Sequence, residues 1–109
     1  MSRVTTAWVL LIMAGLLEIG WPLGLKLSQS SERRIAGLVA AGLCMLASGA
    51  LLWQAQRDIP IGTAYAVWTG IGAAGTFLIG IAYFEDPVSF MRVASAGLIV
   101  VGVIGLKIA

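Results

Sequence analysis

Four long apolar segments, separated by short polar stretches, occupy almost the whole of this 109-residue sequence. They lie at about residues 7–27, 35–54, 61–84 and 88–108. Each has roughly 20 residues or more, enough for a helix to cross a hydrocarbon core about 30 Å thick. The polar stretches between them read SQSSERR, AQRDIP and EDPVS, and they leave no room for a soluble domain. We therefore expect an all-α membrane protein with four transmembrane helices per subunit, forming a single domain over residues 1–109.

The composition agrees with a membrane location. Hydrophobic residues make up 60% of the sequence and charged residues only 11%, against about 25% charged residues in an average soluble domain. A signal peptide is the alternative reading of the first segment, but its apolar pattern continues and no small-residue cleavage site follows closely. A membrane β-barrel would need alternating segments of about ten residues, whereas these runs are continuous.

Several classes of function find no support in the sequence. There is no histidine and only one cysteine, Cys44, so we expect no metal centre, no cofactor and no disulfide framework. The net charge is only +2 and the basic residues form no dense run, so we expect no nucleic-acid partner. The partner that the composition does predict is membrane lipid.

The basic residues beside the segments do not favour one orientation in the membrane. With four helices, the two termini and the second loop share one side, which carries three Lys or Arg residues against four on the other. These residues are Arg3, Arg57 and Lys107 on one side, and Lys26, Arg33, Arg34 and Arg92 on the other. Either other signals fix the topology, or the chain inserts both ways and two identical chains pair in antiparallel fashion.

One carboxylate lies near the middle of the first segment. Glu18 is eleven residues after Ala7 and nine before Leu27, and an acid at this depth costs at least ~2.5–3.5 kcal/mol on insertion scales. Lys26 and Lys107 lie at segment ends, so neither is placed to neutralise it. Glu18 must therefore be protonated or wait for a cation from outside, and we interpret it as a site that protons and a cationic substrate share. A neutral Glu18 bonded to a neighbouring helix is the alternative.

Helical spacing places three notable residues beside Glu18. Gly15 opens room one turn before the carboxylate, and Trp21 lies three residues after it. Pro22 has no N–H, so the Glu18 carbonyl has no donor four residues on, and we expect the helix to bend there. We hypothesise that this free carbonyl adds an acceptor near a cation site, or that the site is widened for larger substituted cations. A packing kink with no role in binding is the alternative.

Three further polar side chains lie inside the apolar segments. Tyr65 and Trp68 share a helix face within GTAYAVWTGIGAAG. Their O–H and N–H need partners in a dry interior, where Glu18 is the available acid, although ordinary aromatic packing is the alternative. Ser48 is the third, and a serine in such a helix most often bonds the carbonyl four residues earlier. We hypothesise that the Trp21 N–H and the Ser48 O–H orient the Glu18 carboxylate.

Glycines are concentrated in the last two segments. In the third they permit either close helix approach or bending, and they are Gly70, Gly72, Gly75 and Gly80. The fourth segment has no polar group inside it apart from Ser95 near its start, so it contributes little to a polar site. Its glycines predict a helix–helix dimerisation surface, and they are Gly97, Gly102 and Gly105. The acidic pair Glu85 and Asp86 is expected to be solvated in a loop.

Three stretches resemble the small multidrug resistance family of proton-coupled exporters, and most closely its guanidinium-exporter branch. They read AGLLEIGW with GLK after it, IPIGTAYAVWTGIGAAGT, and GLIVVGVIGLK. The resemblance implies a multi-pass antiporter of the bacterial inner membrane that works as an antiparallel, dual-topology homodimer. It would export guanidinium or small guanidinyl cations in exchange for protons, with both ligands competing for two Glu18 carboxylates. The first three helices would line the pathway and the fourth would dimerise.

The resemblance also implies roles for individual residues. Glu18 matches the residue that binds proton and substrate, and the residues that match the lining of the substrate site are Gly15, Trp21, Ser48, Tyr65 and Trp68. Trp21 favours the guanidinium branch, because the quaternary-ammonium branch has a small residue there. Two features depart from the branch: Pro22 replaces a small residue, and the first loop reads SQSSERR where G-F-[ST]-R is usual.

Other functions remain open from the sequence. A broader exporter of quaternary ammonium or other hydrophobic cations is the nearest one. A passive cation channel and a non-transporting heterodimer partner belong to different classes. None of these is an enzyme.

Overall fold

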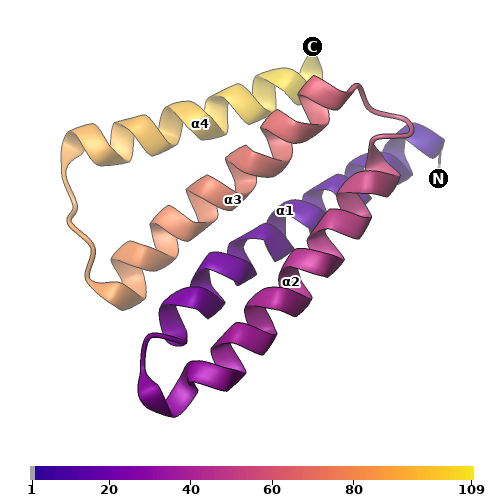
Figure 1. Cartoon of the computed structure of the whole chain (residues 1–109). Helices are drawn as coiled ribbons and strands as arrows, with labels where there is room; N and C mark the ends of the chain where they lie inside the picture. Colours follow the sequence, from indigo (N-terminus) through magenta and orange to yellow (C-terminus); the bar gives the residue numbers. More distant parts are fainter. Residues whose placement is uncertain (1) are drawn as a thin grey trace.

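The computed structural model describes residues 2–109, and their regular structure is entirely helical (Figure 1). The long helices are α1 (Arg3–Leu27), α2 (Arg34–Ala55), α3 (Ile61–Phe84) and α4 (Phe90–Ile108). A short 3₁₀ helix, η1 (Ser31–Arg33), leads into α2. All four long helices are long and apolar enough to cross a membrane.

Two helices begin two or more residues away from the predicted bounds. α1 begins at Arg3, four residues earlier than predicted, because the side chain of Ser2 caps it by accepting a backbone N–H three residues on. α4 begins at Phe90, two residues later than predicted, because Ser89 caps it in the same way. Hydrogen bonds at the helix ends therefore set these starts, rather than the change from polar to apolar sequence.

The helices form two hairpins, α1–α2 and α3–α4, that pack mainly through α1 and α3. α1 contacts α2 most extensively and α3 next, whereas α4 packs on α3. Figure 1 shows α4 close to α3 near the C-terminus and splayed away from it toward the loop that joins them. The subunit measures 45 × 34 × 21 Å.

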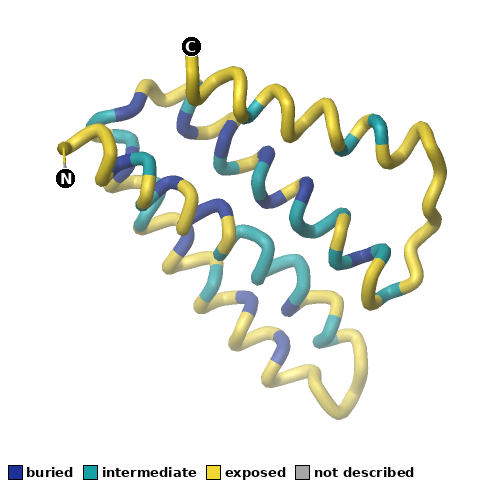
Figure 2. The backbone as a smooth tube through the Cα atoms, turned by 180° about the vertical axis from the view of Figure 1, so that it is seen from behind, coloured by how far each residue is buried: buried dark blue, intermediate teal, exposed yellow. Residues whose placement is uncertain are grey.

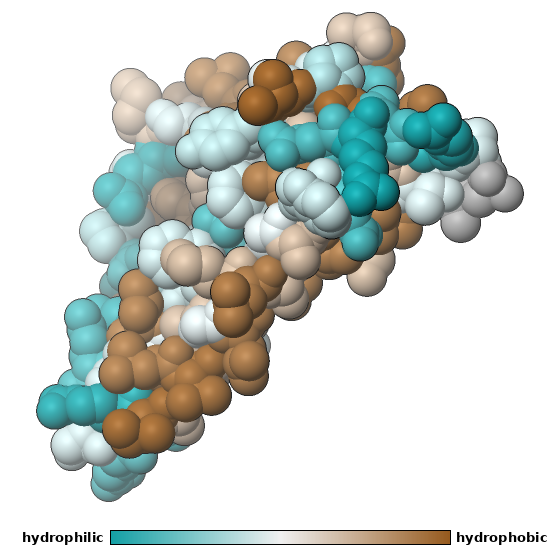
Figure 3. Space-filling view, turned by 45° about the vertical axis from the view of Figure 1, so that its right-hand side comes forward, coloured by the Kyte–Doolittle hydropathy of each residue, from teal (hydrophilic) through white to brown (hydrophobic). Residues whose placement is uncertain are grey.

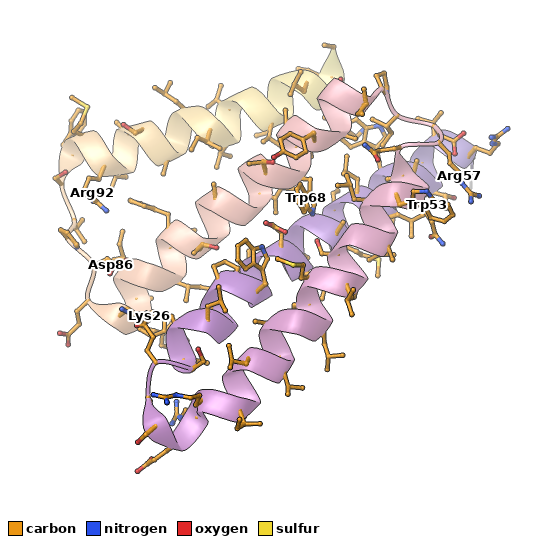
Figure 4. The ribbon with its side chains drawn as sticks, in the orientation of Figure 1. Lys26, Trp53, Arg57, Trp68, Asp86 and Arg92 are labelled. Carbon is orange, nitrogen blue, oxygen red and sulfur yellow. The ribbon has the colours of Figure 1, made fainter. Side chains whose placement is uncertain are left out.

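The buried core lies where the start of α1 meets the turn between α2 and α3. Its members are Ala7, Leu11, Ala55, Ile59, Ala64 and Val67. An ion pair of 2.9 Å between Arg3 and Asp58 joins the same two parts of the chain. At this end Arg57 also lies over the Trp53 ring, 4.6 Å from its centre (Figure 4). The two hairpins are therefore fastened together at one end of the molecule.

Much of the remaining surface is apolar. Figure 2 shows buried residues along the facing sides of α1 and α3, and a fourth helix exposed along nearly its whole length. Figure 3 shows hydrophobic side chains gathered over the lower part of the visible face, with hydrophilic ones at its lower tip and across its upper right. This distribution suits a subunit surrounded by lipid, because large apolar patches are rare on soluble monomers.

Small residues allow the helices to approach closely. A Cβ built on Gly24 of α1 would lie 2.8 Å from the Gly37 carbonyl oxygen of α2, so the two backbones touch. In α3, Gly70 leaves room for the side chain of Val103 of α4. α3 is one continuous helix, and these contacts assign its glycines to close approach.

Candidate functional site

The Glu18 side chain is half-buried between α1 and α3, and Trp21 holds it in place. The indole N–H of Trp21 donates a hydrogen bond of 2.6 Å to Glu18 Oε1. The two residues are three apart on one helix, so local geometry alone brings them together. Within residues 2–109, Trp21 is the one donor to this carboxylate, which leaves Oε2 without a protein partner.

α3 passes very close to the Glu18 side chain. A Cβ built on Gly72 would lie only 2.5 Å from Glu18 Cγ, so no larger residue fits there without a shift. The space at Gly15, which the sequence suggested for the carboxylate, is taken by Ile71 of α3, 2.8 Å from a Cβ built on that glycine. Gly72 is therefore the glycine that faces the acid.

A chain of hydrogen bonds joins three helices beside the acid. Trp68 of α3 donates its N–H to Ser48 Oγ of α2 at 2.8 Å, and Ser48 donates to the Ala14 carbonyl of α1 at 2.6 Å. Figure 4 shows Trp68 reaching from α3 toward the α1–α2 hairpin. Two expectations for Ser48 were therefore wrong, since its hydroxyl bonds neither its own helix nor the Glu18 carboxylate.

These hydrogen bonds affect the position of Glu18 through the backbone of α1. Ala14 is four residues before Glu18, so its carbonyl is the one that the Glu18 N–H reaches in a regular α-helix. Ser48 is fully buried, with 0% of its surface exposed, so the bond it makes is shielded from competing water. The turn of α1 that leads into the acid is thereby attached to both α2 and α3.

Tyr65 packs against Trp68, and no hydrogen bond joins it to the acid among the described residues. The two ring centres are 5.5 Å apart with a tilt of 49°, an ordinary aromatic contact. The Tyr65 side chain is 56% exposed, and in the described residues no hydrogen bond joins its hydroxyl to Glu18. The structure therefore connects Tyr65 to the site through Trp68 alone.

Glu18 opens on a groove between α1 and α3. This cavity has a volume of about 380 Å³, within the range of small-molecule sites. Residues from α1, α3 and the following loop line it, among them Glu18, Pro22, Gly72, Thr76, Phe77 and Asp86. α1 continues as one helix through Pro22, whose missing N–H leaves the Glu18 carbonyl without its usual donor.

Four of these lining residues were not assigned to the site from the sequence: Gly72, Thr76, Phe77 and Asp86. Helical spacing along α3 could have identified some of them as sharing one face of that helix. Asp86 lies in a loop, so helical spacing gives no indication of its position.

The charges around the groove leave Glu18 without a counter-ion. Among the described residues, the ion pair between Arg3 and Asp58 is the only one, and it lies at the other end of α1. The same part of the chain contains no group of three His, Cys, Asp or Glu residues that would suit a metal ion. The groove therefore presents an oriented carboxylate with a free oxygen, an arrangement suited to an organic cation with N–H donors.

Comparison with known proteins identifies the family of this chain. A family model described as Small Multidrug Resistance protein matches residues 6–99. The chain belongs to the small multidrug resistance family. The matched range includes every groove residue named above, and ends within α4. With four helices able to span a membrane, this small multidrug resistance protein is a multi-pass membrane protein.

Its relatives within the family carry a more specific name. A "Guanidinium exporter" from Yersinia pseudotuberculosis is 48% identical over 103 residues, covering 94% of this chain and 98% of the relative. Another, from Escherichia coli (strain K12), is 45% identical over 102 residues, covering 94% and 96%. A third, from Citrobacter freundii, has the same identity and coverage. The similarity therefore extends over nearly the full length of this chain and of each relative.

Proposed function

We propose that this protein exports guanidinium or small guanidinyl cations across the bacterial inner membrane in exchange for protons. The observation that carries the proposal is the Glu18 carboxylate, oriented by Trp21 in an open groove and without a basic partner among the described residues. Its relatives align with nearly the whole chain at 45–48% identity, and their name, guanidinium exporter, supports the same substrate class.

The chemistry of the ligand fits this carboxylate. Guanidinium is planar and rich in N–H donors, so a carboxylate accepts two parallel hydrogen bonds from it. Trp21 occupies one acceptor position on Oε1 and restricts the plane of the group, which favours a flat cation in one orientation. The Glu18 carbonyl, freed by Pro22, supplies a further acceptor beside it. A quaternary ammonium ion has no N–H donors, so it gains only charge attraction from the carboxylate and no hydrogen bond from these acceptors.

Proton exchange follows from the isolation of Glu18 in the membrane. A carboxylate at this depth is stabilised either by a proton or by a bound cation, and the two exclude each other. Release of one ligand then favours uptake of the other from the same side of the membrane, so the two ligands cross in opposite directions. Protons are the only coupling ion that this scheme requires, and it needs no other cofactor.

The functional unit in this proposal is an antiparallel, dual-topology homodimer. α4 has no buried residue in the single subunit, and a Cβ built on Gly97, Gly102 or Gly105 would meet nothing within 4 Å. This free face with small residues suits helix–helix contact in a membrane. Labelling of a single cysteine at the C-terminus from both sides of the membrane supports dual insertion, and labelling from one side alone rejects it.

Transport by purified protein in proteoliposomes tests the function. An imposed proton gradient should drive transport of guanidinium and guanylurea in the direction opposite to proton flow. Tetrapropylammonium should be transported poorly. We expect Glu18→Gln to abolish proton-coupled transport, while Glu85→Gln, the same change in the exposed α3–α4 loop, should retain it. Uphill guanidinium export by Glu18→Gln would refute the mechanism, and guanidinium flux without proton counterflow would indicate a channel. Faster transport of tetrapropylammonium than of guanidinium would indicate the broader exporter.

A further inference from the structure

The groove that contains Glu18 continues toward the loop between α3 and α4. A second cavity, of about 240 Å³, adjoins the first and reaches Lys26 near the end of α1. The two cavities share three lining residues, Pro22, Thr76 and Asp86. Asp86 is thus a second carboxylate of the same groove.

The backbone turns Asp86 back onto α3. Glu85 ends the helix in the left-handed conformation, with φ 57° and ψ 33°, which reverses the direction of the chain. The Asp86 N–H then donates to the Gly80 carbonyl at 3.1 Å. A Cβ built on Gly80 would collide with an Asp86 carboxylate oxygen, so this glycine makes the room that the side chain occupies. Asp86 is exposed to solvent, as expected from the sequence for a loop charge, and its carboxylate also lies against Gly80 of α3.

A threonine that lines both cavities, Thr76, carries a hydroxyl without a partner. Thr76 Oγ1 is fully buried and makes no hydrogen bond with any residue of the described chain. Buried polar atoms are nearly always paired, so an unpaired one that lines a groove indicates a ligand that would pair with it. An N–H of a guanidinyl cation is a suitable donor, since a hydroxyl oxygen is a good acceptor.

The outer end of the groove carries opposite charges that are not paired. Figure 4 shows Lys26 and Asp86 at the same end of the molecule, one on α1 and the other in the α3–α4 loop. Both line the outer cavity, but no ion pair joins them in residues 2–109. Lys26 therefore weakens the attraction of Asp86 for a cation without cancelling it by direct contact. A weak site suits a passage, because an ion must be able to leave it as well as enter.

We propose that Asp86 and Thr76 form an outer station that holds a guanidinyl cation before it reaches Glu18. The inference rests on the proposed function and extends it to a second binding position for the same substrate. Asp86 attracts the cation from water, and the Thr76 hydroxyl accepts an N–H between the two carboxylates. Such attraction raises the rate of capture, and it weakens as salt screens the charge.

Asp86→Asn tests the station, with Glu85→Gln as a matched control that removes a neighbouring loop charge outside both cavities. We expect Asp86→Asn to lower kcat/KM for guanidinium about three- to tenfold at an ionic strength of about 0.01 M, with kcat unchanged. The difference should nearly vanish at about 1 M salt, while Glu85→Gln stays within about twofold of the unaltered protein throughout. Thr76→Val, which replaces the hydroxyl with a methyl group of similar size, should lower affinity to a similar extent at every salt concentration.

Equal losses in Asp86→Asn and Glu85→Gln would overturn the station, because surface charge alone would then explain them. A normal kcat/KM in Asp86→Asn would also overturn it, and so would a loss confined to kcat. The proposed function fails by a different result: the unaltered protein does not move guanidinium, or Glu18→Gln still does. If transport is active and depends on Glu18 but is unaffected by Asp86→Asn, only the outer station is refuted.

Discussion

Replacing Gly72 with alanine places a methyl group against the side chain on which the proposed transport depends. A Cβ at this position would lie 2.5 Å from Glu18 Cγ, whereas ordinary contact begins at 3.4 Å. One of the two groups must therefore move by about 0.9 Å, the difference between these distances. Because α1 and α3 are packed together here, we expect much of this movement to fall on the Glu18 side chain.

The displacement is large enough to break the bond that orients the carboxylate. The bond from Trp21 to Glu18 is 2.6 Å, and a shift of about 0.9 Å along it brings the distance to the limit of a hydrogen bond. Hydrogen bonds to charged groups contribute about 1.5–3 kcal/mol. Loss of this orientation should therefore weaken guanidinium binding about 10- to 100-fold.

Calorimetric titration of guanidinium into protein in detergent micelles measures this loss. Gly62→Ala is the matched control, because it lies in the same helix and a Cβ there would meet nothing within 4 Å. Alanine is favoured over glycine in a helix by about 1 kcal/mol, so neither variant should fail to fold. Binding by Gly72→Ala within twofold of the unaltered protein, at normal thermal stability, would refute the reasoning.

Two further changes separate orientation of the acid from attachment of its helix. Trp21→Phe removes the donor to Glu18 and should weaken guanidinium binding about tenfold with little change in Tm. Calorimetric titration and thermal melting measure these two quantities. Unchanged affinity would contradict this role of Trp21. Ser48→Ala leaves the Trp68 N–H buried without its partner and should lower the free energy of unfolding by about 0.5–2 kcal/mol. Ser95→Ala, whose hydroxyl bonds only its own helix on an exposed face, should lower it far less, and equal losses would contradict the assignment.

The four helices were predictable because their length and composition depend on the thickness of a membrane. An apolar run of about 20 residues has few ways to satisfy its backbone in lipid other than a helix. The starts of α1 and α4 were less predictable, since the capping residues Ser2 and Ser89 lie in polar stretches where a serine is unremarkable. Family membership was also predictable, because the motifs that carry it extend along the whole sequence.

The site was predictable where it is local and not where it joins helices. The contact between Glu18 and Trp21 follows from their spacing in one helix. The partner of Ser48 depends on which carbonyl α1 presents to α2, and helical periodicity does not contain that information. The same holds for Gly72, whose importance comes from the distance between α1 and α3 rather than from any pattern within α3.

The two turns of α1 on either side of Glu18 are held very differently. The turn before it is fixed, because the Ala14 carbonyl accepts from Ser48 and is linked through it to α3. The turn after it lacks one backbone hydrogen bond, because Pro22 has no N–H to offer the Glu18 carbonyl. In the proposed mechanism, a cation bound by the carboxylate would therefore lie between a fixed turn on the Ala14 side and a less constrained turn on the Pro22 side, where the groove opens. Under the proposed function, the proline and the half-buried acid, which conflict in a simple apolar helix, would together give the site a fixed side that orients the ligand and an open side that admits it.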